Sequence, residues 1–344
     1  MCCLFATIGD TVEAKSVADA HVRQREDLHV IDNTPELQSL SRRLGRVHLR
    51  QRLGLESDHA THVLGKGRNF FHIENWYSIH AFIRLTLRCM GLYKRGRRNA
   101  QTIQIRRNEV RLAKLPTAFD GFTLLHLSDL HLDMGVSFPP ALSERLKALE
   151  YDICVITGDF RARTFGDYQP ALAALGQVLA HINKPVYAVL GNHDTIKMVP
   201  PMEAMGITLL MNESIPIQRA GASIHLAGVD DPHYFQLDNI EKAIQDMPPD
   251  EVSILLSHSP EIYRQAAHAG FNLMLSGHTH GGQICLPGGI ALMTNAACPR
   301  RYCRGAWQYH HMQGYTSAGS GAAVVDVRLN CPPEITLQQL RCIQ

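Results

Sequence analysis

Short apolar runs that recur along most of the chain are the feature that most restricts how it can fold. They begin near residue 116, and stretches with helical spacing at 142–149 and 170–182 separate the first three. Alternation of strands and helices favours an α/β architecture in which sheet is buried between layers of helices. We therefore expect strands at 122–127, 153–156, 186–190, 223–226, 253–256 and 273–275, with two more between 319 and 340.

Carboxylate, carboxamide and imidazole side chains follow five of these runs directly. In open α/β sheets, the C-terminal ends of strands are where ligands bind. Each motif alone is common, but five of them at strand ends predict a single polar site. The motifs are Ser128-Asp129-Leu130-His131, Thr157-Gly158-Asp159, Gly191-Asn192-His193-Asp194, Ser257-His258 and Gly277-His278-Thr279-His280.

This ordered set resembles the calcineurin-like metallophosphoesterases over roughly residues 120–340. The resemblance implies a four-layer α/β/β/α sandwich that holds two metal ions at its strand ends. It implies a first metal ligated by Asp129, His131, Asp159 and His280, and a second by Asp159, Asn192, His258 and His278. Asp159 would then bridge the two ions. His193 would stand beside the leaving group as a catalytic residue that binds no metal, and Asp194 would orient its ring.

The implied ligands also restrict the metal and the reaction. Two divalent ions can clamp phosphoryl oxygens and lower the pKa of water, so we expect attack of a metal-held hydroxide on phosphorus. Nitrogen and oxygen ligands without thiolate suit Mn²⁺, Fe or Zn²⁺, and of these we expect Mn²⁺. Cys154 lies within a predicted strand and is expected in the core rather than at the metals.

Two groups of arginines are candidate contacts for a substrate phosphate. Arg161 and Arg163 follow the bridging aspartate, and Arg300, Arg301 and Arg304 lie in a late loop. Guanidinium groups bind phosphate well, but an ordinary solvated loop would carry the same residues. Both interpretations stay open on the sequence alone.

The charge is distributed unevenly, although the whole chain has a formal net charge of only +2. Residues 1–115 contain 20 Lys and Arg against 11 Asp and Glu, whereas residues 116–344 contain 14 against 21. We therefore predict a basic N-terminal extension over 1–115 and a catalytic domain over 116–344. A basic region of this kind favours an anionic partner, either a membrane surface or a nucleic acid.

Two segments of the basic region have helical amphipathic spacing, 37–47 and 73–94. The second combines Trp76 and other apolar residues with Arg84 and Arg88 and runs into a basic cluster at 94–98. This pattern is typical of a helix in an anionic lipid interface, although a helix that packs on the enzyme body would also fit. The aromatic residues are not beside the arginines, which disfavours nucleic acid.

Further motifs are similar to one bacterial, membrane-associated branch of the family that includes UDP-2,3-diacylglucosamine pyrophosphatases. These are the segments 128–132, 277–284 and 333–337. The sequence departs at Asp133-Met134-Gly135, where the branch usually has glycine directly after the first motif. It also has a basic amphipathic segment where the branch often has a membrane span. The resemblance implies hydrolysis of UDP-2,3-diacylglucosamine in lipid A biosynthesis. The alternative is a soluble phosphodiesterase of cyclic nucleotides or other small phosphoesters.

A scaffold without catalysis is the least favoured class, because all seven implied ligand positions hold competent residues. Nine cysteines are scattered without a CxxC motif, and the first residues contain neither a secretory signal nor a twin arginine. We therefore expect a reducing, cytoplasmic location, peripheral on the cytoplasmic face of the inner membrane.

Overall fold

The computed structural model describes residues 34–59 and 77–343. The chain divides into two units, residues 1–58 and 59–344. In the first unit, helix α2 (Pro35–Leu44) begins where the Thr34 side chain accepts a hydrogen bond from the Leu37 N–H. It ends at Gly45, whose φ of 94° favours glycine, and α3 (Arg46–His59) follows. The predicted helical segment 37–47 is thus two consecutive helices.

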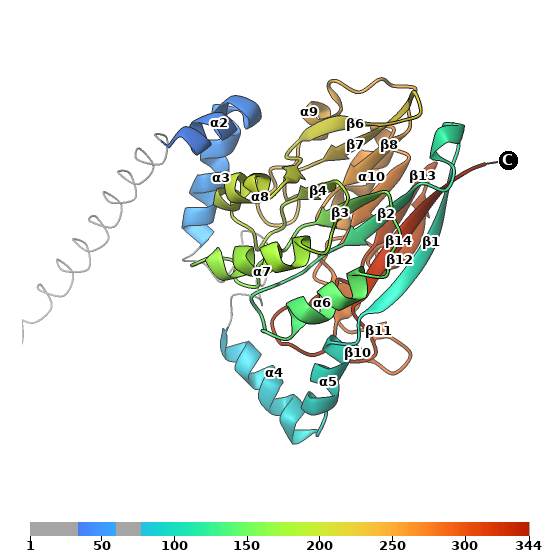
Figure 1. Ribbon diagram of the computed structural model, residues 1–344. Helices are drawn as coiled ribbons and strands as arrows, with labels where there is room; N and C mark the ends of the chain where they lie inside the picture. Colours follow the sequence, from blue (N-terminus) through green and yellow to red (C-terminus); the bar gives the residue numbers. More distant parts are fainter. Residues whose placement is uncertain (1–33, 60–76, 344) are drawn as a thin grey trace, which may run out of the picture. The chain divides into compact units, whose positions relative to one another are not determined.

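Two six-stranded sheets form the second unit (Figure 1). The order in the first is β1 (Gln104–Leu112), β14 (Glu334–Cys342), β2 (Thr123–Leu127), β3 (Ile153–Thr157), β4 (Val186–Val189) and β5 (Ile207–Leu209). The order in the second is β12 (Gly305–Tyr309), β13 (Met312–Thr316), β9 (Leu273–Ser276), β8 (Ser253–Leu256), β7 (Ala222–Gly228) and β6 (Glu213–Arg219). Strands β2 to β5 are parallel, as are β7, β8, β9 and β13.

Apolar side chains join the sheets face to face. One cluster contains Leu124 and Val155 of the first sheet together with Leu226, Ile254 and Leu275 of the second. Helices cover the outer faces: α6 (Phe138–Leu146), α7 (Gln169–Leu179) and α8 (Val199–Ala204) on the first sheet, α9 (Ile240–Ile244) and α10 (Tyr263–His268) on the second (Figure 1). The predicted α/β/β/α layering is therefore confirmed.

The six strands predicted from the apolar runs are all present, but the last part of the chain differs from the prediction. Only one strand of this unit, β14, lies between 319 and 340 where two were expected. The segment before it contains Pro332 and Pro333, which have no N–H to donate to a sheet. These prolines and the glycines at 319 and 321 favour a loop instead.

Strand β1 was not predicted, because its sequence is mainly polar. It pairs with β14 in parallel from Gln104↔Glu334 to Leu112↔Cys342. As an edge strand it exposes charged side chains such as Arg106 and Arg107, which is a common way to protect a sheet edge. The sheet thus includes residues on the N-terminal side of the expected boundary at 115.

Helices α4 (Tyr77–Cys89) and α5 (Tyr93–Ala100) precede β1. Leu87 of α4 packs in a cluster with Val325, Val327 and Leu329, while Phe82 and Leu85 of the same helix are 66% and 60% exposed. The helix therefore packs on the body along one side and leaves apolar residues exposed on the other. Arg97 of α5 pairs with Asp326 at 2.9 Å. Trp76 lies outside the described residues.

Among the helices in the described part of the chain, none is long and apolar enough to cross a membrane.

Candidate metal centre

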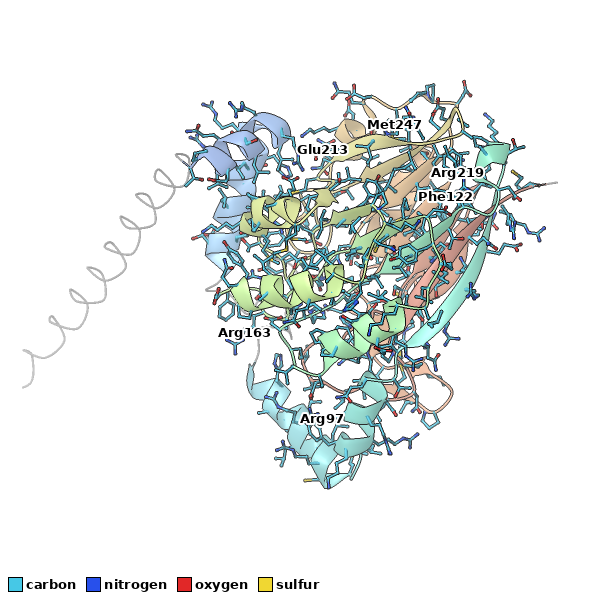
Figure 2. The ribbon with its side chains drawn as sticks, in the orientation of Figure 1. Arg97, Phe122, Arg163, Glu213, Arg219 and Met247 are labelled. Atoms are coloured by element: carbon cyan, nitrogen blue, oxygen red, sulfur yellow. The ribbon has the colours of Figure 1, made fainter. Side chains whose placement is uncertain are left out.

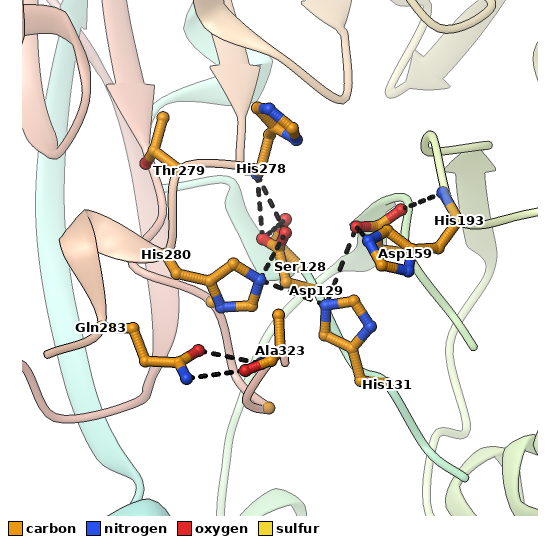
Figure 3. Close-up of polar contacts among 12 residues, drawn as sticks. Ser128, Asp129, His131, Asp159, His193, His278, Thr279, His280, Gln283 and Ala323 are labelled. Atoms are coloured by element: carbon orange, nitrogen blue, oxygen red, sulfur yellow. Dashed lines mark hydrogen bonds and ion pairs between the residues drawn. The ribbon is translucent and has the colours of Figure 1, made fainter. Parts of the chain in front are cut away.

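The loops at the ends of five strands bring all seven predicted metal ligands together. Figure 3 labels Asp129, His131, Asp159, His278 and His280 among them. The loop after β2 carries Asp129 and His131, and those after β3 and β4 carry Asp159 and Asn192. The loops after β8 and β9 carry His258, His278 and His280. All seven side chains are buried. We call these seven residues the polar floor.

The floor consists of two groups of donor atoms. In the first, His280 Nε2 lies 3.4 Å from Asp129 Oδ1 and 3.1 Å from His131 Nε2. His131 Nε2 is in turn 3.7 Å from Asp159 Oδ2. This group matches the ligand set predicted for the first ion.

The second group shares the same Asp159 oxygen. His258 Nε2 lies 3.3 Å from Asp159 Oδ2 and 2.9 Å from Asn192 Oδ1. His278 Nδ1 is 3.0 Å from Asn192 Oδ1 and 3.2 Å from His258 Nε2. A single carboxylate thus adjoins both groups, as the bridging role requires. The residues fit two divalent cations by donor type as well, since every donor is oxygen or nitrogen.

Backbone carbonyls fix the orientation of three imidazoles. His131 Nδ1 donates to Arg161 O at 2.9 Å, and His258 Nδ1 donates to Thr157 O at 2.7 Å. His278 uses its other nitrogen, Nε2, to donate to Asn295 O at 2.8 Å. In the neutral rings of His131 and His278, the nitrogen that faces the floor therefore keeps its lone pair, which is what a metal ligand needs.

His280 differs from these three because its outer nitrogen faces a donor. Arg328 Nη2 lies 3.1 Å from His280 Nδ1, and a guanidinium can only donate. Nδ1 therefore accepts, and Nε2 carries the hydrogen toward Asp129. Ligation through Nε2 requires Arg328 to release Nδ1. The guanidinium is fully buried and also donates to the carbonyls of His280, Gly319 and Gly321.

Unusual backbone geometry is concentrated at the floor. Asp129, His131, Asp159, His278 and His280 all have positive φ, between 42° and 68°. Residues other than glycine rarely adopt a positive φ, because this backbone conformation is strained for them. The strain persists where the surrounding structure enforces it, often at functional sites. Gly158 shows the crowding, because a Cβ there would lie 2.6 Å from the Gly191 nitrogen.

The electrostatics of the floor favour cation binding. Burial lowers the pKa of His131 to about 3 and those of His278 and His280 well below the ordinary value. Burial also lowers the pKa of His258, but the Asp159 carboxylate more than offsets it and raises the value to about 10. Most of the imidazoles are thus neutral, the state in which they bind metals, while Asp159 attracts positive charge.

His193 lies beside the floor, with Nε2 3.9 Å from Asp159 Oδ2. Its Nδ1 donates to Ala162 O at 2.7 Å, so this carbonyl orients the ring. The prediction gave that task to Asp194. Instead, the Asp194 carboxylate accepts hydrogen bonds from the backbone N–H groups of Asp159 and Phe160, at 2.8 and 2.9 Å. Asp194 therefore positions the loop of the bridging carboxylate.

The structure does not bring the predicted arginines to the floor. Arg161 is buried and donates to the carbonyls of His193, Thr164 and Gly166, so its guanidinium supports the loop instead of facing a substrate. Arg163 is exposed and projects from the surface (Figure 2). The late group supports a neighbouring loop: Arg300 donates to the carbonyls of Ala291 and Leu292, Arg301 lies 4.7 Å from the Tyr302 ring, and Arg304 packs near Gly281.

A cavity of about 450 Å³ opens directly over the floor. Asp159, Asn192, His193, His278 and His280 line its polar end. Much of the remainder is apolar, and we call this part the apolar wall: Phe82, Ile83 and Leu87 of α4, Leu292, Met293, and Ala323 to Val325. None of the described residues that line the cavity is an arginine.

One side chain connects the wall with the floor. Gln283 donates to Ala323 O at 2.7 Å and accepts from the Ala323 N–H at 2.8 Å (Figure 3). It also donates to Val325 O at 3.0 Å. It lies three residues after His280 in the same loop. The position of the wall segment is thus fixed to the loop that supplies two floor imidazoles.

Several supporting residues were missed by sequence reasoning. Ser128 Oγ donates to Asp129 Oδ2 at 2.6 Å and accepts from Thr157 Oγ1 at 2.7 Å. Asn295 contributes only a carbonyl, so its side chain gave no signal, and Arg328 is an isolated arginine in the sequence. Ser128 was within a motif and could have been recognised. Cys154 is buried in β3, as expected.

Residues 122–282 match the sequence profile of the family described as calcineurin-like phosphoesterase. The chain is 30% identical over 260 residues to the uncharacterized metallophosphoesterase YkoQ of Bacillus subtilis, covering 72% of this chain and 94% of that protein. It is 31% identical over 250 residues to the transmembrane protein with metallophosphoesterase domain of Bos taurus, covering 66% of this chain but 55% of that protein. It is 29% identical over 235 residues to phosphodiesterase YaeI of Escherichia coli, covering 64% and 82%.

Proposed function

The chain belongs to the calcineurin-like metallophosphoesterase family and is a phosphoester hydrolase, and we propose that it cleaves the diphosphate of UDP-2,3-diacylglucosamine. The products would be a lipid monophosphate and UMP. The observation that carries this proposal is the cavity in which the polar floor and the apolar wall meet. A substrate with a phosphate at one end and acyl chains at the other has chemistry complementary to both parts.

The polar floor would hold two divalent ions. Asp129, His131, Asp159 and His280 would bind one, and Asp159, Asn192, His258 and His278 the other. When bound, the ions supply positive charge that polarises a phosphoryl group and acidifies water. We propose Mn²⁺, because the donors are carboxylate, carboxamide and imidazole.

His193 is the residue of this site best placed to deliver a proton to the departing oxygen. His193 lines the cavity, its Nε2 faces Asp159, and its Nδ1 hydrogen is committed to Ala162 O. Because the neutral ring has only one hydrogen, Nε2 can donate only when the ring is protonated. The proposed acid is therefore the imidazolium form. Asp194 would assist indirectly, by holding the backbone of the Asp159 loop.

The proposal includes association with an anionic membrane surface, on the cytoplasmic face of the inner membrane. Its support is the composition of α4 and α5, which contain five arginines and one lysine and no acidic residue. Phe82, Leu85 and Met90 are exposed beside these cations. Apolar side chains flanked by cations suit a lipid interface, and Phe82 also lines the cavity. An acylated substrate would then enter from the bilayer.

The decisive experiment compares specificity constants for three substrates with the purified, Mn²⁺-loaded enzyme. These are UDP-2,3-diacylglucosamine, a cyclic nucleotide and a chromogenic phosphodiester. We expect the acylated nucleotide to be preferred by at least about tenfold, because burying even part of an acyl chain contributes about 0.8 kcal/mol per methylene. Preference for the cyclic nucleotide or the small diester would replace the lipid substrate by the soluble phosphodiesterase alternative.

A further inference from the structure

Two cysteines lie close together in the loop that continues from the apolar wall. The Sγ atoms of Cys298 and Cys303 are 3.6 Å apart, and both residues are free thiols. Cys298 is half-buried and Cys303 is buried. A disulfide bond is about 2.05 Å long, so the sulfurs would need to approach by about 1.5 Å to bond.

A tight turn brings these two residues together. Between them the 3₁₀ turn η6 (Arg300–Tyr302) is closed by a bond from the Tyr302 N–H to Pro299 O at 2.9 Å. The Cys303 N–H then donates to Arg300 O at 3.1 Å. These bonds fold Cys303 back toward Cys298, so the backbone brings the two thiols together.

The two sulfurs have the electronic character of a reactive pair. The hydrogen bond between the two sulfurs lowers the pKa of Cys303 to about 7 and raises the pKa of Cys298 well above its ordinary value. A thiolate is therefore accessible at neutral pH, and the thiolate is the reactive form. Cys285 near Cys331 provides a contrast, because burial, with Cys331 beside it, raises the pKa of Cys285 to about 11.

The loop that holds the pair also contacts the metal centre at two points. Asn295 O, three residues before Cys298, accepts the hydrogen bond from His278 Nε2 at 2.8 Å. Cys303 O accepts from Thr279 Oγ1 at 2.6 Å. A movement that brings the two sulfurs into bonding distance would therefore act on the segment that orients His278.

We propose that Cys298 and Cys303 are a redox modification site, which forms a reversible disulfide and thereby weakens metal binding at His278. The oxidant is a small disulfide. The Cys298 thiol gives its proton to the Cys303 thiolate and attacks one oxidant sulfur, and the other oxidant sulfur leaves as a thiol that takes up a proton from water. Cys303 then loses its proton and attacks the Cys298 sulfur, which releases the second thiol. Two protein thiols and one disulfide thus become one protein disulfide and two thiols.

The test uses the full-length, Mn²⁺-loaded protein incubated with oxidised glutathione, alkylated, and digested with trypsin. Trypsin cuts after Arg300 and Arg301, between the two cysteines, so the disulfide is read as a linked pair of peptides by mass spectrometry. We expect this linked pair to be the main product and to disappear when dithiothreitol is added. We also expect the oxidised protein to bind Mn²⁺ with about tenfold lower affinity, which is the scale for loss of a group that orients a metal ligand.

Variants separate the pair from other thiols. Cys298→Ser and Cys303→Ser should give no linked peptide and an affinity for Mn²⁺ that oxidised glutathione does not change. The matched control is Cys89→Ser, since Cys89 is an exposed thiol on α4 and should leave both results as in the unmodified chain.

Two results would overturn the inference: absence of the linked peptides in the unmodified chain, or their presence with Mn²⁺ affinity unchanged. The inference relies on the proposed metal ligand His278 but not on the proposed substrate. Failure of the reduced protein to bind Mn²⁺ would instead count against the proposed metal centre.

Discussion

The polar floor and the apolar wall border the same cavity but are built in opposite ways. The floor consists of buried side chains at strand ends, five of them on strained backbone. The wall comes from a helix and two loops, and Phe82, Leu292 and Met293 remain more than half exposed. A reaction centre needs fixed geometry, whereas a surface that receives an apolar group needs only shape and area. We infer that the floor sets the reaction and the wall selects the substrate.

The largest effect is expected from Asp159→Asn in the floor. Replacing the shared carboxylate removes the negative charge that both donor groups use, so the variant should lose bound metal together with activity. We expect turnover to fall by about 10³-fold or more, the scale of lost transition-state charge stabilisation. Elemental analysis gives the metal content, with Asp250→Asn as an exposed control. If the variant bound two ions normally, Asp159 would not be the bridge.

The next effect should come from His193→Ala, which tests the floor without removing a metal ligand. Turnover should fall by about 10²–10⁴-fold, as for loss of a general acid, while metal content stays unchanged. The measurement is the rate at saturating substrate beside elemental analysis of the same sample. Metal loss in parallel with the rate would place His193 among the ligands.

A smaller, substrate-dependent effect should follow from Phe82→Ser in the wall. The phenyl contact contributes about 1.5–2 kcal/mol to binding of the acyl chain, so its loss should lower kcat/KM for the acylated substrate by about tenfold or more. The value of kcat/KM for the small chromogenic diester should not change. Leu85→Ser is the matched control in detergent, because Leu85 is similarly exposed on α4 but does not line the cavity. Equal losses on both substrates would contradict the division between floor and wall.

The double substitution Lys94→Glu with Arg95→Glu tests the surface beside the wall. Both side chains are exposed. Each cation near an anionic surface contributes about 1 kcal/mol to membrane binding, so binding to phosphatidylglycerol vesicles should weaken by about tenfold or more. Sedimentation with vesicles measures this binding, and Lys147→Glu, at the residue directly after α6, is the control. Unchanged vesicle binding would remove the membrane from the proposed function.

A separate effect concerns stability beneath the floor. Burial lowers the pKa of His126 to about 3, and its Nε2 lies 3.0 Å from Thr157 Oγ1. The unfolded chain takes up this proton near pH 6.5, so the free energy of unfolding should fall as pH drops below 6.5, by up to about 1.4 kcal/mol per unit until about pH 3. In His126→Gln, urea unfolding between pH 4.5 and 7 should show a shallower dependence. An identical slope would show that His126 is not buried as a neutral ring.

Much of the floor was predictable because it follows from local sequence. An apolar run of four or five residues predicts a buried strand, and a polar motif directly after it, such as Gly191-Asn192-His193-Asp194, has a fixed place at the strand end. Strand β1 was not predictable in the same way. Its sequence is mainly polar, and such a sequence forms an edge strand only when a neighbouring strand, here β14, pairs with it.

The roles of individual side chains were less predictable than their location. Asp194 ends one motif and Arg161 follows another, but Asp194 accepts from the Phe160 N–H and Arg161 donates to His193 O, which are backbone groups of neighbouring loops. A carboxylate that accepts hydrogen bonds from backbone N–H groups has no sequence signature, and neither has a guanidinium that donates to backbone carbonyls. The wall likewise combines α4 with residues 323–325, which are more than 200 positions away.

The sequence alone thus determined the layered α/β class and the chemical types of the donors, since both depend on residues within a few positions of each other. Only the tertiary structure decided which nitrogen of each imidazole faces inward, which residues cover the cavity, and that Cys298 approaches Cys303. These properties arise when separate loops pack against each other and compete for the same hydrogen-bond partners, and no short stretch of chain contains that information.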